Sequence, residues 1–161
     1  MSNDFSLIAA KKAKGQQGKV SEKKVAEYLA AIDANVTHFD WNRGYDARAA
    51  GGKFQRVAGD FAFYSPVGHG IIEVKEVDHE FRLPYKNFEL SQVAKAAKRE
   101  LAGGDVHVLV YHTPLKRWRR LPIVFFQHRT GTEYSSWDLS EWVLHPSCAA
   151  ALDIHMRKHT A

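Results

Sequence analysis

The hydrophobic positions near the start of the chain follow a helical period. Val25, Leu29 and Ile32 are spaced i, i+4, i+7 in a polar segment, which is the pattern of a helix that buries one stripe. We predict this helix over residues 19–33. Glu22 lies three residues before Val25 and therefore on the same stripe, so its carboxylate is expected to point toward the interior.

Later segments alternate between strand and helix character. Residues 57–64 and 70–77 are rich in β-branched and aromatic residues, and Pro66 and Gly68 between them predict a hairpin. Residues 105–112 alternate as a half-buried strand does. We also predict a short strand at 123–126, and helices over 88–102, ended by Gly103-Gly104, and over 147–158.

Composition places the chain among globular proteins. It has 161 residues, of which 45% are hydrophobic and 25% are charged, which predicts one domain and excludes a disordered tail or a fibre. No apolar run is long enough to span a bilayer, and the first residues lack the order of a secretory signal. The sequence therefore predicts a cytoplasmic protein without membrane contact. The single cysteine, Cys148, excludes an internal disulfide and a cysteine-rich zinc site.

The net charge of +5 comes mostly from the first 120 residues. Such an excess suits a polyanion, because each neutralised phosphate releases condensed counterions. An ordinary solvated surface explains it about equally well. Three basic segments are candidates for DNA contact: a mobile arm at 1–18, a loop at 41–56 with interleaved aromatic residues, and a turn at 116–120. With Lys19 at the start of the predicted helix, the candidate cations are Lys11, Lys12, Lys14, Lys19, Arg43, Arg48, Lys53, Arg56, Lys116, Arg117, Arg119 and Arg120.

Charged residues on the two predicted hairpin strands are candidates for chemistry. Glu73 and Lys75 share one face of their strand, and Asp60 on the preceding strand can pair beside Glu73. With Glu22 they would form a cluster of three carboxylates and one lysine. Such acids repel one another unless a cation lies among them, and a hard divalent ion, Mg²⁺ or Mn²⁺, suits oxygen ligands. This arrangement predicts phosphodiester hydrolysis, whereas the alternative is a cross-strand salt bridge on a solvated sheet face.

Together, these segments resemble the PD-(D/E)XK nuclease superfamily, and most of all its RecU-like and phage-type Holliday junction resolvases. Asp60 and Glu73-Val74-Lys75 resemble the metal-binding and catalytic strands, and Gly18 to Glu22 resembles the first helix with its acid. The stretch 81–88, followed by Ser91-Gln92, resembles the segment before the next helix. Gly59 stands in place of the superfamily's proline, and Ser91 in place of the usual histidine.

The resemblance implies an α/β fold with a restriction-endonuclease-like core, in which helices flank a central mixed β-sheet. It implies that Asp60, Glu73 and the Val74 carbonyl bind Mg²⁺, with Mn²⁺ as a substitute, and that Glu22 binds the metal or its water shell. Lys75 would serve the attacking water, and Gln92 would support the site from the next helix. It also implies a homodimer on branched DNA, with no small-molecule cofactor.

The resulting hypothesis is a single nuclease domain over residues 1–161 that nicks four-way junctions in the presence of Mg²⁺. Two alternatives stay open. One is another endonuclease of the same superfamily, acting in repair or at a specific sequence. The other is a nonenzymatic DNA-binding module with the same fold.

Overall fold

A central five-stranded sheet organises the protein. The computed structural model describes the backbone of residues 4–44, 59–129 and 135–153, with side chains from Val20 onward. The strand order is β1 (Asp40–Arg43), β2 (Phe61–Ser65), β3 (Gly68–Val77), β5 (Asp105–His112) and β6 (Arg117–Leu121). β3 and β5 are parallel, and the other neighbouring pairs are antiparallel, so the sheet is mixed.

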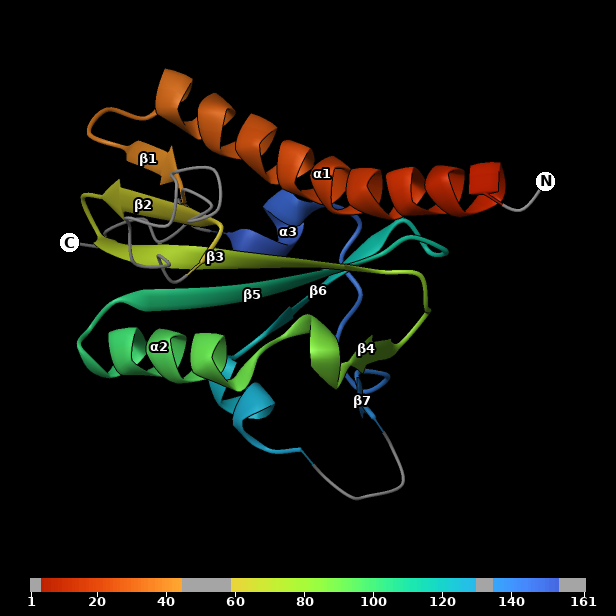
Figure 1. Cartoon of the computed structure of the whole chain (residues 1–161). Helices are drawn as coiled ribbons and strands as arrows, with labels where there is room; N and C mark the ends of the chain where they lie inside the picture. Colours follow the sequence, from red (N-terminus) through yellow and green to blue (C-terminus); the bar gives the residue numbers. More distant parts are fainter. Residues whose placement is uncertain (1–3, 45–58, 130–134, 154–161) are drawn as a thin grey trace, which may run out of the picture.

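Helices cover both faces of this sheet (Figure 1). α1 (Asp4–Asn35) lies over one face, together with the short α3 (Cys148–Leu152), and α2 (Leu90–Leu101) lies over the other. β4 (Arg82–Pro84) and β7 (Ser136–Asp138) form a separate two-stranded sheet, next to the 3₁₀ helices Tyr85–Asn87 and Ile123–Gln127. The predicted α/β class, a central mixed sheet flanked by helices, is confirmed.

Alternation along β3 divides the core into two layers. Ile72 and Val74 pack with Val25 and Leu29 of α1. Ile71 and Val77 belong to the cluster on the other face, together with Val93 and Ala96 of α2. α2 connects two parallel strands, as such crossovers do, and it ends at Gly103, whose φ of 91° is one that glycine adopts readily. Glu73 and Lys75, which lie on the same side of β3 as Ile71 and Val77, are therefore directed toward the α2 side.

Four predicted elements differ from the structure. α1 begins at Asp4, so residues 4–18 of the predicted arm are continuous with the helix. The predicted loop 41–56 starts inside β1, because residues 40–43 pair with β2, and its residues 45–56 lie outside the described part. The apolar run at 123–126 is a 3₁₀ helix that buries Ile123 and Phe126. The last helix ends at Leu152, and residues 154–158 are not described.

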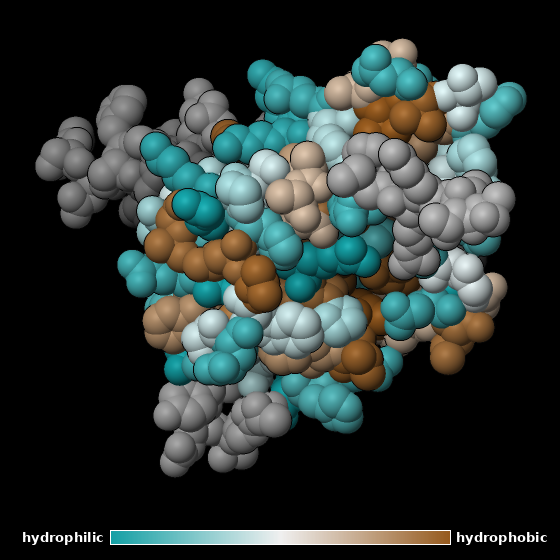
Figure 2. Space-filling view, turned by 180° about the vertical axis from the view of Figure 1, so that it is seen from behind, coloured by the Kyte–Doolittle hydropathy of each residue, from teal (hydrophilic) through white to brown (hydrophobic). Residues whose placement is uncertain are grey.

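The surface carries its apolar side chains in separate patches. Figure 2 shows them on one face among predominantly hydrophilic neighbours. Within the described ranges, none of the helices combines the length and the apolarity that crossing a membrane requires.

A buried polar network fixes the connection between β3 and β4. His112 on β5 is fully buried, and its Nδ1 lies 2.6 Å from the backbone oxygen of His79. Its Nε2 lies 3.0 Å from Nη1 of Arg119, which also donates to the Glu80 carbonyl at 2.7 Å. Since Arg119 can only donate, Nε2 accepts and Nδ1 donates, which defines a neutral tautomer. Burial first, and then the charge of Arg119, lower the pKa of His112 to about 4.

This network predicts that acid destabilises the fold. Between pH 6.5 and about 4 the unfolded chain binds a proton at residue 112 that the folded chain does not, so the stabilisation from neutral His112 is lost as the pH falls through this window. The loss should approach roughly 2–3 kcal/mol. Urea unfolding of wild type and of His112→Gln between pH 7 and pH 4.5 measures it. A wild-type chain whose pH dependence equals that of the variant contradicts this account.

Candidate active site

The β2–β3 hairpin brings the predicted acids and the lysine together. Phe61, the first residue of β2, pairs with Ile72, so Asp60, which immediately precedes β2, lies next to the position at which Glu73 follows on β3. Glu73 and Lys75 project toward α2, since they alternate with Ile72 and Val74, which face α1. The expectation that Glu73 and Lys75 share one face is confirmed by their side-chain contact.

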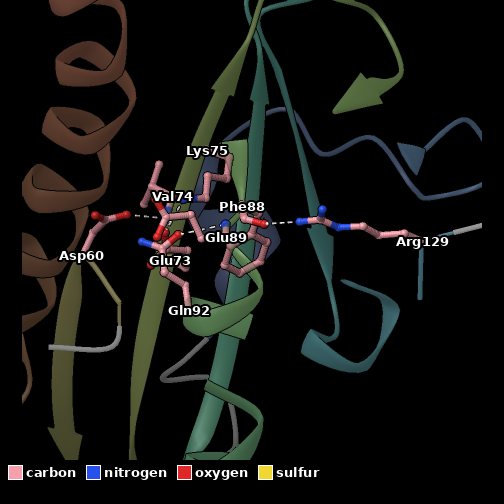
Figure 3. Close-up of polar contacts among 8 residues, drawn as sticks. All are labelled: Asp60, Glu73, Val74, Lys75, Phe88, Glu89, Gln92 and Arg129. Carbon is pink, nitrogen blue, oxygen red and sulfur yellow. Dashed lines mark hydrogen bonds and ion pairs between the residues drawn. The ribbon is translucent and has the colours of Figure 1, made fainter. Parts of the chain in front are cut away.

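The Asp60 carboxylate lies against the backbone of β3. The Asp60 amide donates to the Ile72 carbonyl at 2.8 Å, and Oδ2 of Asp60 accepts the Val74 amide at 2.7 Å. In Figure 3 the Asp60 side chain points from just before the start of β2 toward Val74. Gly59, with a φ of 87°, precedes it, and a Cβ there would lie 3.0 Å from that of Ile71. A glycine therefore suits the turn that directs Asp60 inward.

Glu73 and Lys75 form a nearly buried ion pair. Nζ of Lys75 lies 2.5 Å from Oε1 of Glu73, and the two side chains are 13% and 7% exposed. The ammonium also lies 4.8 Å from the centre of the Phe88 ring, which is buried beneath it. Contact with a carboxylate and with an aromatic face stabilises the charge of Lys75 at this depth.

Asp60 carries the marked pKa shift of the site. Burial raises the pKa of Asp60 to about 7, with a further contribution from the negative charge of Glu73. The Val74 hydrogen bond and the charge of Lys75 act in the opposite direction, and Glu22 adds a smaller upward effect. A carboxyl group held between its two protonation states near neutral pH, beside a second acid, is typical of a functional site.

Of the three predicted acids, the structure brings Asp60 beside Glu73, whereas Glu22 has a partner of its own. Glu22 is half-buried on α1, on the sheet face opposite to Glu73, and it forms an ion pair with Arg43 of β1. Its charge reaches Asp60, but its carboxylate is engaged by that guanidinium. The pattern of α1 predicted the orientation of Glu22 toward the protein, whereas β1, which carries Arg43, was not predicted as a strand.

Gln92 has a local structural contact. Its Oε1 accepts the Glu89 amide at 3.3 Å, and so the side chain helps to cap the start of α2. Figure 3 shows Gln92 beside Glu73, at the α2 end of the site. It borders the site with its oxygen used at the helix start, and its supporting role stays a prediction.

Two residues near the site were not predicted. Phe88 supports Lys75, and Arg129 donates to the carbonyls of Phe88 and Tyr85 at 3.3 Å and 3.4 Å. The Arg129 guanidinium also lies over the rings of Tyr85 and Trp137. Arg129 thus fixes the segment that carries Phe88. No local pattern in the sequence connects these residues, because their contacts join distant segments.

The candidate DNA-contacting cations are distributed over several elements. Lys116 and Arg117 are exposed at the β5–β6 turn, and Arg120 is partly buried, with Nη1 donating to the Leu152 carbonyl at 3.2 Å. Arg43 lies on β1 and pairs with Glu22. The backbone of residues 11, 12, 14 and 19 belongs to α1. The predicted contacts at Arg48, Lys53 and Arg56 lie outside the described residues.

The prediction that Arg119 contacts DNA is wrong. Arg119 is 4% exposed, and its guanidinium donates to the carbonyls of Glu80 and Trp142. Arg119 projects from β6 toward His112, whereas the neighbouring Arg120 lies on the opposite face of the strand and is only partly buried. It stabilises the fold and does not face a ligand.

The donor set fits a divalent cation only in part. Among the described residues, no group of three or more His, Cys, Asp or Glu side chains is arranged to hold an ion. Asp60 and Glu73 nevertheless supply two carboxylates beside the Val74 backbone, where burial, and then the charge of Glu73, raise the pKa of Asp60. Mg²⁺ in phosphate chemistry uses one or two carboxylates, with water and substrate oxygens as its other ligands. The two acids fit such a site.

Comparison with known proteins finds a resemblance among solved structures. No family model matches the chain, and no curated protein sequence does either. Among solved structures, the chain is similar to Hjc, a Holliday junction resolvase from the archaeal hyperthermophile Archaeoglobus fulgidus. The identity is 18%, the match covers 73% of this chain and 87% of the other, and the TM-score is 0.47. A likeness at this level does not identify a function.

Proposed function

We propose that this protein is a Mg²⁺-dependent DNA endonuclease that nicks four-way junctions. The observation that supports this most is the position of Asp60. Its carboxylate is buried against the Val74 amide, beside the Glu73–Lys75 pair, and its pKa is raised to about 7. Burying two acids and a lysine together is costly for stability, which favours a functional reason for the arrangement.

Each residue has a role that follows from its position. Asp60, Glu73 and the Val74 carbonyl would hold the cation, for which Mn²⁺ can substitute. The bound ion would polarise a phosphodiester oxygen and acidify a water molecule. Lys75, held over Phe88, would orient the attacking water and stabilise developing negative charge. Glu22, held by Arg43, would act through the water shell, and Gln92 would fix the start of α2 beside the site.

The exposed cations and the symmetry of a junction complete the proposal. We assign phosphate contacts to Lys116 and Arg117 at the β5–β6 turn, to Arg43 and Arg120, and to Lys11, Lys12, Lys14 and Lys19 of α1. A four-way junction is nearly two-fold symmetric and needs paired nicks, so a symmetric homodimer with one site per subunit would suit it. The protein would act on DNA in the cytoplasm, which is the cytoplasm of the host if the chain is phage-encoded.

A gel assay tests the substrate and the metal together. Wild type is incubated with a synthetic four-way junction or with a linear duplex of the same sequence, in Mg²⁺ or in EDTA. We expect nicks in the junction only, and only with Mg²⁺. Equal cutting of both substrates would instead identify another endonuclease of this fold, acting in repair or at a specific sequence. Asp33→Asn, an exposed carboxylate on α1, is the matched control and should cut as wild type does.

A nonenzymatic DNA-binding module is the second candidate. The observation that favours it is that two of the acids have partners within the chain, Glu73 with Lys75 and Glu22 with Arg43. In that case the junction is bound with equal affinity in Mg²⁺ and in EDTA and is not cut in Mg²⁺ or Mn²⁺. Binding without nicking under all these conditions would replace the proposed enzyme with this module.

A further inference from the structure

A pair of aromatic residues, Tyr64 and His69, lies on the same face of the hairpin as the candidate active site. Ala62 pairs with Ile71 and Tyr64 pairs with His69, so these residues continue the row that Asp60 and Glu73 begin. Tyr64 is four positions along the chain from Asp60, which corresponds to about 13 Å along a strand. A DNA strand of a few nucleotides can span that distance.

Tyr64 and His69 form an exposed aromatic platform. Their ring centres are 6.3 Å apart and the ring planes differ by 18°, so the rings are stacked. Tyr64 is 52% exposed and His69 is also exposed. A large aromatic side chain held in this way offers a flat apolar surface to a partner with a π face, such as a nucleobase.

A cavity beside this platform is lined in part by a cationic side chain, that of Arg99. It has a volume of about 150 Å³, and its lining includes Tyr64, His69 and Arg99. Arg99 is exposed near the end of α2. Asp105 at the same cavity is the opposing charge, so an anion is expected on the Arg99 side. The cavity is smaller than the pockets that enclose a whole ligand, and it would admit a phosphate next to a base stacked on Tyr64.

The α2 helix links this cavity to the active site. Gln92, Lys95 and Arg99 are spaced i, i+3, i+7 and therefore share one side of the helix. Gln92 lies beside Glu73 at one end (Figure 3), and Arg99 borders the cavity at the other end. Lys95, which is exposed, lies between them. Positive charge thus follows the side of α2 that leads from the acids to the aromatic platform.

We propose that Tyr64, His69 and Arg99 form a subsite for the DNA strand that continues from the reacting phosphodiester. Arg99 binds a backbone phosphate, and Tyr64, supported by His69, stacks on a base that is unpaired at the branch point. This inference rests on the proposed function, because it places the strand relative to that site. It explains how a junction, which offers unstacked bases, is preferred to a continuous duplex.

Binding in EDTA tests the subsite without requiring cleavage. Affinity for a fluorescent four-way junction is measured for wild type, Tyr64→Ala, Tyr64→Phe and Arg99→Ala. We expect Tyr64→Ala to weaken junction binding roughly 5- to 150-fold, the range for the loss of one stacked base, while Tyr64→Phe binds as wild type does. Arg99→Ala should weaken binding and lower the slope of affinity against salt by about one phosphate contact.

Controls separate the possible outcomes. Lys23→Ala removes an exposed cation on α1, over the other face of the sheet, and should leave affinity unchanged. Equal melting temperatures show that the variants fold. Affinities of Tyr64→Ala and Arg99→Ala within twofold of wild type overturn the subsite, as does an equal loss by Tyr64→Ala on linear duplex. Because no cut is needed, a chain that binds through Tyr64 but never nicks refutes the proposed enzyme and retains the subsite.

Discussion

Replacing Asp60 with asparagine is expected to abolish strand cleavage and, at the same time, to make the metal-free protein more stable. The amide keeps an oxygen that can accept the Val74 amide but removes a buried charge next to Glu73. Loss of one charged group at the reacting centre should reduce cleavage by on the order of 10²–10³-fold or more. The free energy of unfolding at pH 8 in EDTA should rise by about 1–3 kcal/mol.

The raised pKa of Asp60 determines how the stability gained by Asp60→Asn depends on pH. The folded pKa of Asp60, about 7, lies above the ordinary aspartate value of 3.8, so the folded chain is penalised as the pH rises between these values. The advantage of Asp60→Asn should therefore be complete above pH 7 and absent near pH 4. Thermal unfolding in EDTA across this range measures it, and each kcal/mol corresponds to about 2–4 °C. A variant that is less stable than wild type at pH 8 contradicts the strain assigned to Asp60.

Gly70→Ala is expected to destabilise the fold by about 4 kcal/mol or more. Gly70 is buried on β3 between Phe63 of β2 and Asp105 of β5. A Cβ at this position would lie 2.3 Å from the Asp105 backbone oxygen and 2.8 Å from the Phe63 ring. Since one of these neighbours is backbone, relief requires separating the strands that position the hairpin and its acids.

Gly104→Ala is the matched control for this substitution. There a Cβ would meet its nearest atom, the Arg99 carbonyl oxygen, at 3.4 Å, which is an ordinary contact, so the change in unfolding free energy should stay below about 1 kcal/mol. Urea unfolding of the three proteins makes the comparison. If Gly70→Ala and Gly104→Ala unfold at the same urea concentration, the close packing of β3 between β2 and β5 is wrong.

Local signals in the sequence were sufficient for the centre of the fold. The hairpin, α2 and β5 follow from strand periodicity, turn residues and the glycine stop at Gly103, and each is confirmed. The shared face of Glu73 and Lys75 follows from alternation alone. These features depend on neighbours within a few residues, which is why the sequence is informative there.

Other elements depend on tertiary contacts that no local pattern records. Residues 40–43 are polar and mostly exposed, and they form a strand because β2 pairs with them. The run at 123–126 is apolar and begins with two β-branched residues, which favours a strand. Its buried residues, Ile123 and Phe126, are however three positions apart, a spacing that a 3₁₀ turn satisfies. The helical character of residues 4–18 was missed because Gly15 and Gly18 were interpreted as breakers.

The site shows the same division. Asp60, Glu73 and Lys75 were found from strand register, because two adjacent strands determine their positions. The partner of Glu22 was not found, since Arg43 reaches it only after β1 has joined the sheet edge. Phe88 and Arg129 were missed because their roles require the chain to return past the site from a distant segment.

Direct measurement of the cation tests the central claim, namely that Asp60 and Glu73 bind a divalent ion in front of Lys75. Mn²⁺ is titrated by electron paramagnetic resonance into wild type and into Glu73→Gln, each bound to the same four-way junction, with free junction as the background. We predict one additional tightly bound Mn²⁺ per chain in wild type, which is lost in Glu73→Gln. Equal Mn²⁺ binding by the two complexes would contradict the metal site and the nuclease built on it.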